Sequence, residues 1–471
     1  MSSYSPFDQE LEALEAADLE ALTRAREGWY IEYKREVPTA VSIAKSVSAF
    51  ANTYGGWIFY GVEEESKEDA VAGAFPGIAR ADADAAQQRI RHAVAGLMNP
   101  EAHFDTKVVW GPHSPIGLAE NQGIICIRVA QSVNAPHVHK SGQIYRRVAD
   151  GSEPKPESDR FILDQLFRRA DQTRKDYRRW INRQDPELSE GEGENPYLRL
   201  MLVADIWHDR DAWLDLDADK VRSFLGPGAG RAHFGCIPFD TIYTSSGGYV
   251  ARQVKGNNPH NLGLTWRLRP HLVSEVIVPF NFQAPNHPGM IAVNWSGYDH
   301  VDRFVKILAA QGHKSPRVID LNVLFNALLG VAEAQQRLLA AAGWKYGYTV
   351  KAKLLNVWRT IPFLDVSRVL DGFEKHGTPM CLDGDVLAPR GTDPETFSEV
   401  KPYGHIENEY GQLILQTLDM FRPIAEAFGL PKWLDPNPDK EEEVYYDELQ
   451  KAGRNAMKVQ DLRLKRSDDD D

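Results

Sequence analysis

The chain has 471 residues, too many for one ordinary hydrophobic core, so two or three domains are expected. Its 42% hydrophobic and 26% charged residues are typical of a soluble globular protein, and no apolar run approaches the ~20 residues of a membrane helix. The net charge of −13 does not exclude a nucleic-acid partner, because the acidic excess lies in the first 20 residues and the C-terminal third, whereas Arg160–Arg183 contains eight basic and three acidic residues.

The first third of the chain is expected to alternate short strands with helices. Apolar residues at spacings of two predict strands, and spacings of three and four predict helices. In chain order, the expected elements are an acidic helical lead (Asp8 to about Arg26), a half-buried strand (Trp29–Lys34), a helix (Thr39–Asn52), a buried strand (Trp57–Val62), a helix (Asp82–Leu97), and strands at Phe104–Trp110, Gly123–Ala130 and Gln143–Val148. Thr39 is a plausible N-cap of the first full helix.

A long basic helix, Arg160–Arg183, is expected next, followed by a polar linker rich in glycine and proline (residues 184–196). Beyond the linker, the pattern predicts a second α+β domain. Its expected strands are Tyr197–Ala204, His233–Ile242, Gly248–Val254, Leu264–Leu268 and Ser274–Phe282, and its expected helices are His300–Gln311, Val318–Ala341 and Gln412–Gly429. No catalytic arrangement is recognisable in this half.

Three acidic residues and a lysine are placed where strands begin or end. Glu32 and Lys34 share one face of a strand, because side chains two residues apart point the same way. Gly28 permits a bend that brings Glu27 to that side, and Glu64 lies just past the neighbouring apolar strand. Three converging carboxylates would form a hard-oxygen site for Mg²⁺ or Mn²⁺, although a chain with 67 acidic residues offers many accidental triplets.

These segments resemble the Schlafen AlbA_2 domain. The resemblance rests on Glu27-x4-Glu32-Tyr-Lys34, on Ser48-Ala-Phe-Ala-Asn-Thr-Tyr-Gly-Gly56, and on Gly61-Val-Glu-Glu64 after an apolar strand. It implies that Glu27, Glu32 and Glu64 are the metal-binding and catalytic acids of an endoribonuclease, with Lys34 contacting phosphate. The third acid is Glu rather than Asp, and the cysteines Cys126, Cys236 and Cys381 are too dispersed for the zinc site of the animal nucleases.

Basic residues form the predicted nucleic-acid surface. They are Lys45, Arg146 and Arg147 in the first domain, and Arg168, Arg169, Arg174, Lys175 and Arg178 on the basic helix. An exposed ion pair is an equal alternative for Arg146 and Arg147, and a solvated face is the alternative for the helix. Gly55-Gly56 is expected to form a tight turn rather than approach a phosphate, and His137 and His139 are expected to be polar surface rather than metal ligands.

The sequence therefore predicts an α+β protein with an N-terminal Schlafen AlbA_2-like domain and a second α+β domain. The expected parts are an acidic lead (1–22), the AlbA_2-like domain (23–155), the basic helix (156–183), the linker (184–196), a sensing or oligomerisation domain (197–435) and an acidic tail (436–471). The first hypothesis is a metal-dependent endoribonuclease that acts on tRNA or other structured RNA. The family resemblance implies that such an activity would suit a prokaryotic defence or stress response. The alternatives are a non-catalytic DNA- or RNA-binding regulator and an assembly protein.

The expected setting is the cytoplasm, because the acidic N-terminus has no apolar core of a secretory signal and the cysteines have no disulfide spacing. The expected partners are nucleic acid, with RNA favoured over DNA, and at least one more copy of the chain. A homodimer is the simplest way to recover the two-lobed cradle of the animal nucleases from one AlbA_2 copy. No membrane partner is expected.

Overall fold

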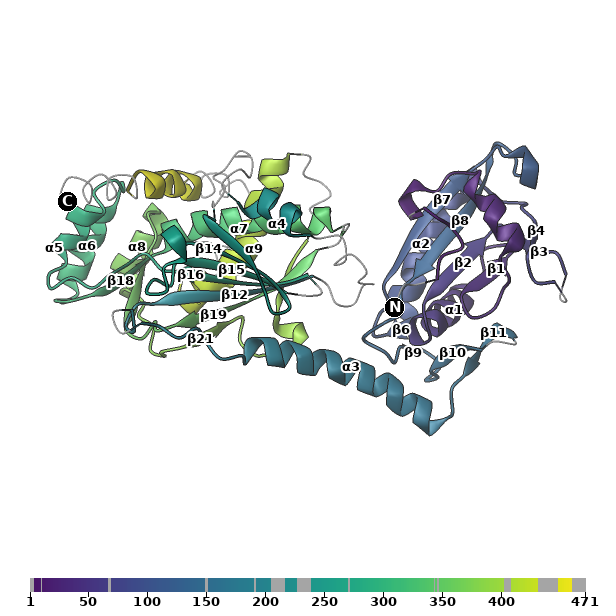
Figure 1. Ribbon diagram of the computed structural model, residues 1–471, viewed down its shortest axis with the longest axis horizontal. Helices are drawn as coiled ribbons and strands as arrows, with labels where there is room; N and C mark the ends of the chain where they lie inside the picture. Colours follow the sequence, from purple (N-terminus) through teal and green to yellow (C-terminus); the bar gives the residue numbers. More distant parts are fainter. Residues whose placement is uncertain are drawn as a thin grey trace. The chain divides into compact units, whose positions relative to one another are not determined.

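Two compact units make up the chain in the computed structural model, and the boundary between them lies within helix α3, between Asp176 and Tyr177 (Figure 1). The structure describes residues 4–9, 11–66, 69–148, 151–189, 192–204, 217–226, 239–269, 272–342, 344, 347–401, 408–430 and 448–459. Both units combine helices with sheets, so the predicted α+β class is confirmed. No helix in the described ranges is long and apolar enough to cross a membrane.

A five-stranded sheet organises the first unit. Its strands run in the order β1-β2-β8-β5, with β7 also paired to β8. These strands are β1 (Ile31–Lys34), β2 (Gly56–Tyr60), β5 (Ile78–Ala79), β7 (Phe104–Trp110) and β8 (Gln122–Val129). Strand β1 lies at the sheet edge, parallel to β2, whereas the other pairs are antiparallel. Small hairpins and bridges complete the unit: β3 (Glu63–Glu64) with β4 (Ala72–Ala74), β6 (Met98–Asn99) with β9 (Val138–His139), and β10 (Tyr145–Val148) with β11 (Gly151–Pro156).

Both faces of this sheet are covered. Helices α1 (Ala40–Asn52) and α2 (Arg80–Leu97) bury one face, and the apolar side chains of the N-terminal lead bury the other. The lead forms two short 3-10 helices, Leu11–Ala13 and Asp18–Arg24, rather than one longer helix. The prediction of a half-buried first strand is therefore wrong, because Ile31–Tyr33 is buried on both sides. Strand β7 has the predicted bounds, and Thr39 caps α1 by accepting a hydrogen bond from the Ser42 amide.

A larger mixed structure forms the second unit. The strands of its main sheet follow the order β13-β14-β15-β16-β12-β19-β21, with β22 also paired to β19. They are β12 (Tyr197–Ala204), β13 (Thr241–Ser245), β14 (Gly248–Gln253), β15 (Leu264–Arg269), β16 (Val273–Pro279), β19 (Tyr348–Leu355), β21 (Val386–Ala388) and β22 (Ser398–Val400). A second sheet contains β17 (Phe282–Gln283), β18 (Arg317–Asp320) and β20 (Thr360–Phe363). The helices are α4 (Ala218–Leu225), α5 (Gly289–Asn294), α6 (Val301–Ala310), α7 (Leu321–Ala341), α8 (Ser367–His376) and α9 (Glu409–Ala427).

Strand β12 has the predicted bounds, but the predicted helix Val318–Ala341 begins too early. Its first residues belong to β18, and the Asp320 carboxylate caps α7 by accepting from the amides of Asn322 and Val323. A strand that runs directly into a helix leaves no glycine or proline between the two elements in the sequence, which explains the error. Most of the predicted strand His233–Ile242 and the residue Cys236 lie outside the described residues. The other two cysteines are buried free thiols.

Candidate functional site

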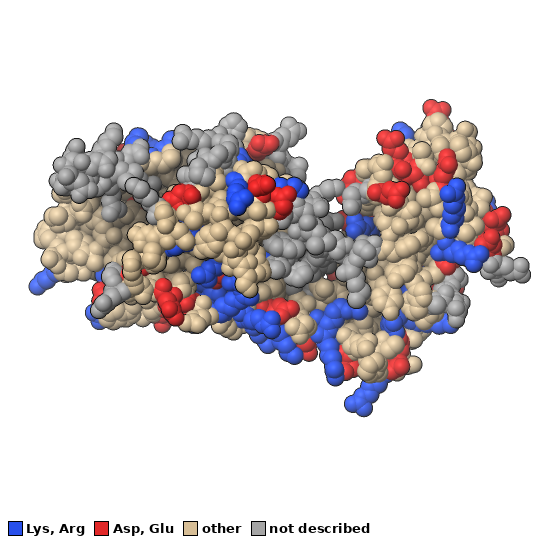
Figure 2. Space-filling model, viewed as in Figure 1, with Lys and Arg blue, Asp and Glu red and all other residues tan. Residues whose placement is uncertain are grey.

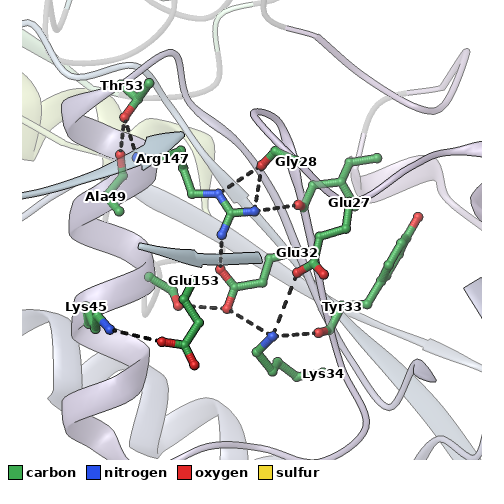
Figure 3. A network of polar contacts seen from close by, with 12 residues as sticks. Glu27, Gly28, Glu32, Tyr33, Lys34, Lys45, Ala49, Thr53, Arg147 and Glu153 are labelled. Carbon is green, nitrogen blue, oxygen red and sulfur yellow. Dashed lines mark hydrogen bonds and ion pairs between the residues drawn. The ribbon is translucent and has the colours of Figure 1, made fainter. Parts of the chain in front are cut away.

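Glu27, Glu32 and Lys34 meet at the edge of the first sheet (Figure 3), and Glu64 contacts Glu27 there. Glu27 lies in the bend before β1, Glu32 and Lys34 lie on β1, and Glu64 lies on β3. The Lys34 Nζ is 3.8 Å from Glu27 Oε1 and 3.7 Å from Glu32 Oε1. The bend expected at Gly28 therefore brings the two carboxylates, five residues apart, to one ammonium group.

Glu27 is a buried carboxyl group without a protein hydrogen bond. Its side chain is 2% exposed, and neither of its carboxylate oxygens has a hydrogen-bond partner among the described residues. The pKa of Glu27 is raised to about 9, first by burial and then by the facing Glu64 carboxyl group, while the Lys34 ammonium partly opposes the rise. Two carboxylates that face each other are both acceptors, so a proton on one of them turns the contact into a hydrogen bond. The raised pKa therefore favours the protonated form of Glu27 at neutral pH when no cation is present.

Glu32 has the opposite environment, because protein groups satisfy both of its oxygens. Arg147 Nη1 donates to Glu32 Oε2 at 2.9 Å, and the Ser46 hydroxyl donates to Oε1 at 2.8 Å. The same guanidinium donates to the carbonyl oxygens of Gly28 (2.9 and 2.6 Å) and Ile31 (3.0 Å). Arg147 therefore ties Glu32 to the bend that carries Glu27, and it holds the geometry of the site.

This position corrects the expectation that Arg147 contacts nucleic acid. Its side chain is 0% exposed and stacks on the Phe50 ring at 4.7 Å, so it cannot reach a phosphate in solution. The structural role of Ser46 was also missed. A small polar residue among the apolar positions of α1 was the available signal, since such a residue on a buried helix face needs a polar partner.

The end of helix α1, with Asn52 and the following Thr53, has a structural role. The Asn52 side chain accepts from the His137 amide at 2.7 Å and donates to the carbonyl oxygens of His137 and Tyr145 at 3.0 Å. The Thr53 hydroxyl accepts from the Arg147 amide at 2.9 Å and donates to the Ala49 carbonyl at 2.7 Å. These bonds join the C-terminus of α1 to the segment that supplies Arg147.

The following Gly55-Gly56 pair forms the expected tight turn into β2. Both glycines have positive φ angles, 73° and 147°. A Cβ atom at Gly55 would lie 2.7 Å from the Val129 carbonyl oxygen, and one at Gly56 would lie 2.4 Å from that of Tyr30. Both approaches are shorter than real carbon contacts, so glycine is required for the chain path.

The two other basic residues of the first domain that were predicted to contact nucleic acid, Lys45 and Arg146, both have acidic partners. Lys45 Nζ is 3.8 Å from Glu153 and lies over the Tyr145 ring, whereas Arg146 pairs with Glu157 at 2.7 Å. Lys45 keeps 30% of its side chain exposed, compared with 14% for Arg146. Of these two, Lys45 is the better placed to meet a phosphate.

Helix α3 (Arg160–Ile181) carries the other predicted contacts, and Figure 2 shows its basic side chains interspersed with acidic ones. Arg168 is 77% exposed and pairs only one turn away with Asp164, and Lys175 is exposed. Arg169 donates to the Ser132 carbonyl, and Arg178 pairs with Asp393 at 2.7 Å. Arg174 is half-buried. The exposed residues of α3 therefore form a narrower basic stripe than the sequence predicts.

His137 and His139 are buried rather than surface residues, so the expectation of polar surface is wrong. His137 Nδ1 lies 2.7 Å from the Pro100 carbonyl, and burial lowers the pKa of His137 to about 4. Across the part of the chain that the structure describes, no three or more His, Cys, Asp or Glu side chains are arranged to hold a metal ion by themselves. Any cation at Glu27 and Glu64 would thus need further ligands from water or a substrate.

Residues 27–156 match the family model described as Schlafen, AlbA_2, which confirms the resemblance read from the motifs: this part of the chain is a Schlafen AlbA_2 domain. Curated proteins gave no match. Among solved structures, the DIP2311 protein from Corynebacterium diphtheriae is 19% identical, with a TM-score of 0.20, over 46% of this chain and 34% of that one. The chain thus spans about a third of that structure, and a TM-score of 0.20 does not show a shared fold.

Proposed function

We propose, from the Schlafen AlbA_2 domain at residues 27–156, that this protein is a divalent-metal-dependent endoribonuclease that cleaves tRNA or another structured RNA. The family assignment supports a role in nucleic-acid binding or cleavage. The observation that favours cleavage is the buried Glu27 carboxyl group, which faces a second carboxyl group, Glu64, and accepts no hydrogen bond from an amide, hydroxyl or guanidinium group of the described residues. A purely structural carboxylate at this depth would be expected to have a donor, as Glu32 has.

Glu27 and Glu64 fit Mg²⁺ or Mn²⁺ as two of its ligands. Both cations prefer oxygen ligands, and Mg²⁺ is commonly held by one or two carboxylates together with substrate phosphates and water. That mode agrees with the absence of a complete three-ligand group among the described side chains. A bound cation would activate a water molecule and stabilise the charge that develops on the scissile phosphate.

The other two residues have supporting roles in this proposal. Glu32 is a positioning residue, because Arg147 and Ser46 occupy its oxygens and fix the bend that carries Glu27. Lys34 keeps 35% of its side chain exposed while its Nζ donates to the Tyr33 carbonyl. Its ammonium group is therefore held beside the carboxylates and can bind a phosphate oxygen of the substrate.

A non-catalytic nucleic-acid-binding regulator is the second candidate function. The arrangement of Glu32 favours it, because a carboxylate whose oxygens both have protein donors contributes nothing to catalysis by itself. In that case Lys45 and the exposed residues of α3 would bind the phosphate backbone, and the binding would weaken as salt rises.

Incubation of end-labelled total tRNA with Mn²⁺ or Mg²⁺ separates these functions. The full-length protein, Glu27→Gln, Glu64→Gln and Glu63→Gln are compared. Glu63 is the matched control, since it adjoins Glu64 but is 45% exposed and pairs with Arg35. We expect fragments from the wild type and Glu63→Gln, and a rate lower by roughly 100-fold or more in the other two variants.

Glutamine is isosteric with the protonated carboxyl group that Glu27 is expected to hold, so Glu27→Gln should fold normally, which circular dichroism can check. Equal cleavage by the wild type and Glu27→Gln would contradict the proposed site. Intact tRNA and intact single-stranded DNA in every sample, together with salt-sensitive binding, would favour the regulator. Absence of binding even at low salt would favour the assembly protein.

A further inference from the structure

A basic pocket lies on the main sheet of the second unit. Its volume is about 420 Å³, and its floor is formed by β13, β14, β15 and β16, with walls from Pro186, Glu187, Glu192, Pro259, Asn261 and Leu262. Arg267 and Arg269 are two residues apart on β15 and face the pocket, whereas the intervening Leu268 packs into the core. Tyr243, which is 38% exposed, lines the same pocket from β13.

Positive charge exceeds negative charge beneath this pocket. The buried Glu275 carboxylate is shared by three guanidinium groups, from Arg199 (2.6 Å), Arg269 (3.2 Å) and Arg267 (3.5 Å). Burial alone would raise the pKa of Glu275, yet the arginines, Arg199 first, hold it below its ordinary value. Asp185 adds one carboxylate beside Arg199, but the Lys353 ammonium also binds Asp185.

Two side-chain nitrogen atoms in this group of arginines, which also includes the neighbouring Arg183, have no hydrogen-bond partner among the described residues. Within the described ranges, Arg269 Nε and Arg183 Nη1 are buried and unsatisfied. Burial and the neighbouring Arg269 guanidinium both lower the pKa of Arg183, which shows how closely the cations are gathered. Of the two residues, Arg269 lines the pocket, and a buried donor of this kind normally has an acceptor, so an anion in the pocket is the ligand that Arg269 lacks.

The acidic residues of the pocket wall do not supply that acceptor. Glu192 accepts from the Leu262 amide at 2.6 Å and from the Ser189 hydroxyl at 2.8 Å, and Glu187 accepts from the Gln184 amide group at 3.4 Å. These carboxylates therefore stabilise the wall itself, and Arg267 and Arg269 remain directed to the pocket.

We propose that this pocket binds a nucleoside 5′-phosphate, with Arg267 and Arg269 on the phosphate and Tyr243 against the base. A volume of 420 Å³ lies within the range of small-molecule sites and greatly exceeds what inorganic phosphate needs. Guanidinium groups match phosphate oxygens in geometry and charge, and a tyrosine ring offers a stacking surface for a base. The site belongs to the second unit and does not depend on the nuclease proposal.

Isothermal titration calorimetry of the full chain tests the proposal, with the four ribonucleoside 5′-monophosphates, adenosine and inorganic phosphate as probes. We expect at least one monophosphate to bind more tightly than both adenosine and inorganic phosphate. Arg267→Gln should weaken that binding by about tenfold or more, because it removes a charge-assisted contact. Arg222→Gln on α4 is the control, since Arg222 is exposed, pairs with Asp219 and does not line the pocket.

Arg267→Gln is expected to fold, because Arg199 and Arg269 still neutralise Glu275. Tyr243→Ala gives a second variant on an exposed side chain, and it should also weaken the binding of the monophosphate. Absence of binding by every monophosphate overturns the proposal, as does equal binding by the wild type and both pocket variants. Tighter binding of inorganic phosphate than of any nucleotide would show that the site binds simple anions. If a short oligonucleotide, titrated as a further probe, binds more tightly than every monophosphate, the pocket is part of a nucleic-acid surface. Each of these two results contradicts the proposal.

Discussion

Buried charge is arranged in opposite ways in the two units. At the edge of the first sheet, the Glu27 carboxyl group faces Glu64, and one ammonium group, that of Lys34, serves both Glu27 and Glu32. On the main sheet of the second unit, one carboxylate, Glu275, serves three arginines. A charge surplus that the fold itself does not neutralise indicates a ligand of the opposite sign, so the first site is suited to a cation and the second to an anion.

The first unit also contains both kinds of carboxylate within one short segment. Glu32 is neutralised by the fully buried Arg147, whereas Glu27 faces Glu64 and lies 3.8 Å from the Lys34 ammonium group. The difference separates a residue that maintains the geometry of the site from one that is available to a ligand. Each prediction below tests one side of this contrast.

Arg147→Met should have the largest effect. The change leaves the Glu32 charge buried without its partner and removes the donors to Gly28 and Ile31, so we expect a loss of about 3–5 kcal/mol in the free energy of unfolding. Urea unfolding measures it. The matched control is Arg35→Met, whose exposed pair with Glu63 should be worth less than about 1 kcal/mol. Similar losses in the two variants would show that the Glu32–Arg147 pair does not hold the site together.

Glu275→Gln tests the same idea in the second unit. Because the variant leaves three guanidinium groups without their shared carboxylate, we expect a destabilisation of about 3 kcal/mol. An added phosphate anion should restore part of the loss, so phosphate should raise the melting temperature of the variant more than that of the wild type. An equal response of both proteins to phosphate would contradict the assigned charge surplus.

The stability of the first unit should depend on Glu27 in a defined pH range. The pKa of Glu27 is about 9 in the folded chain and 4.5 ordinarily, so between these values the folded state binds more protons than the unfolded state. The free energy of unfolding in EDTA should therefore fall as pH rises from about 4.5 to 9, by at most about 1.4 kcal/mol per pH unit. Glu27→Gln should lack this slope and exceed the wild type in stability by a margin that grows with pH. Parallel curves for the two proteins would disprove the raised pKa.

The smallest effect is expected on helix α3. Arg168 and Lys175 are exposed, so a variant with glutamine at both positions should bind RNA more weakly and reduce the slope of log affinity against log salt by about 1 to 2. Arg178→Gln should change the slope less, because Asp393 already pairs with Arg178. Filter binding at several salt concentrations measures both. An unchanged slope in the double variant would remove α3 from the nucleic-acid surface.

Local patterns in the sequence were sufficient for much of the fold. Strands β7 and β12 have the predicted bounds, because each is a run of residues with high strand propensity that is bounded by turn residues. The helix after Thr39 also has its expected cap. The sequence predicts one helix for the N-terminal lead, but the structure has two short 3-10 helices whose leucines cover one face of the sheet. This packing is a tertiary effect, and the spacing of apolar residues along the sequence does not reveal it.

The site shows where reasoning from sequence fails. The meeting of Glu27 with Lys34 followed from the bend at Gly28, but the burial of Arg147 did not, because its partner Glu32 is 115 residues away. A neighbouring arginine, Arg146, has the same local pattern and remains partly exposed. The basic pocket of the second unit was likewise missed, because the predicted strand ended at Leu268 and left out Arg269, which lies on β15 two residues after Arg267. Which face of that strand is covered depends on Pro186, Glu187 and Glu192, which line the pocket beside it.

Binding of Mn²⁺ to the metal-free protein at pH 7 tests the central claim most directly. Calorimetry in two buffers with different ionisation enthalpies gives both the affinity and the number of protons released. Because Glu27 is protonated at this pH, a cation at Glu27 and Glu64 should displace roughly one proton per ion. Glu27→Gln should abolish the proton release and weaken binding by about tenfold or more, whereas Glu63→Gln should behave as the wild type. Equal binding by Glu27→Gln and the wild type, or binding without proton release, would contradict the assignment of this site.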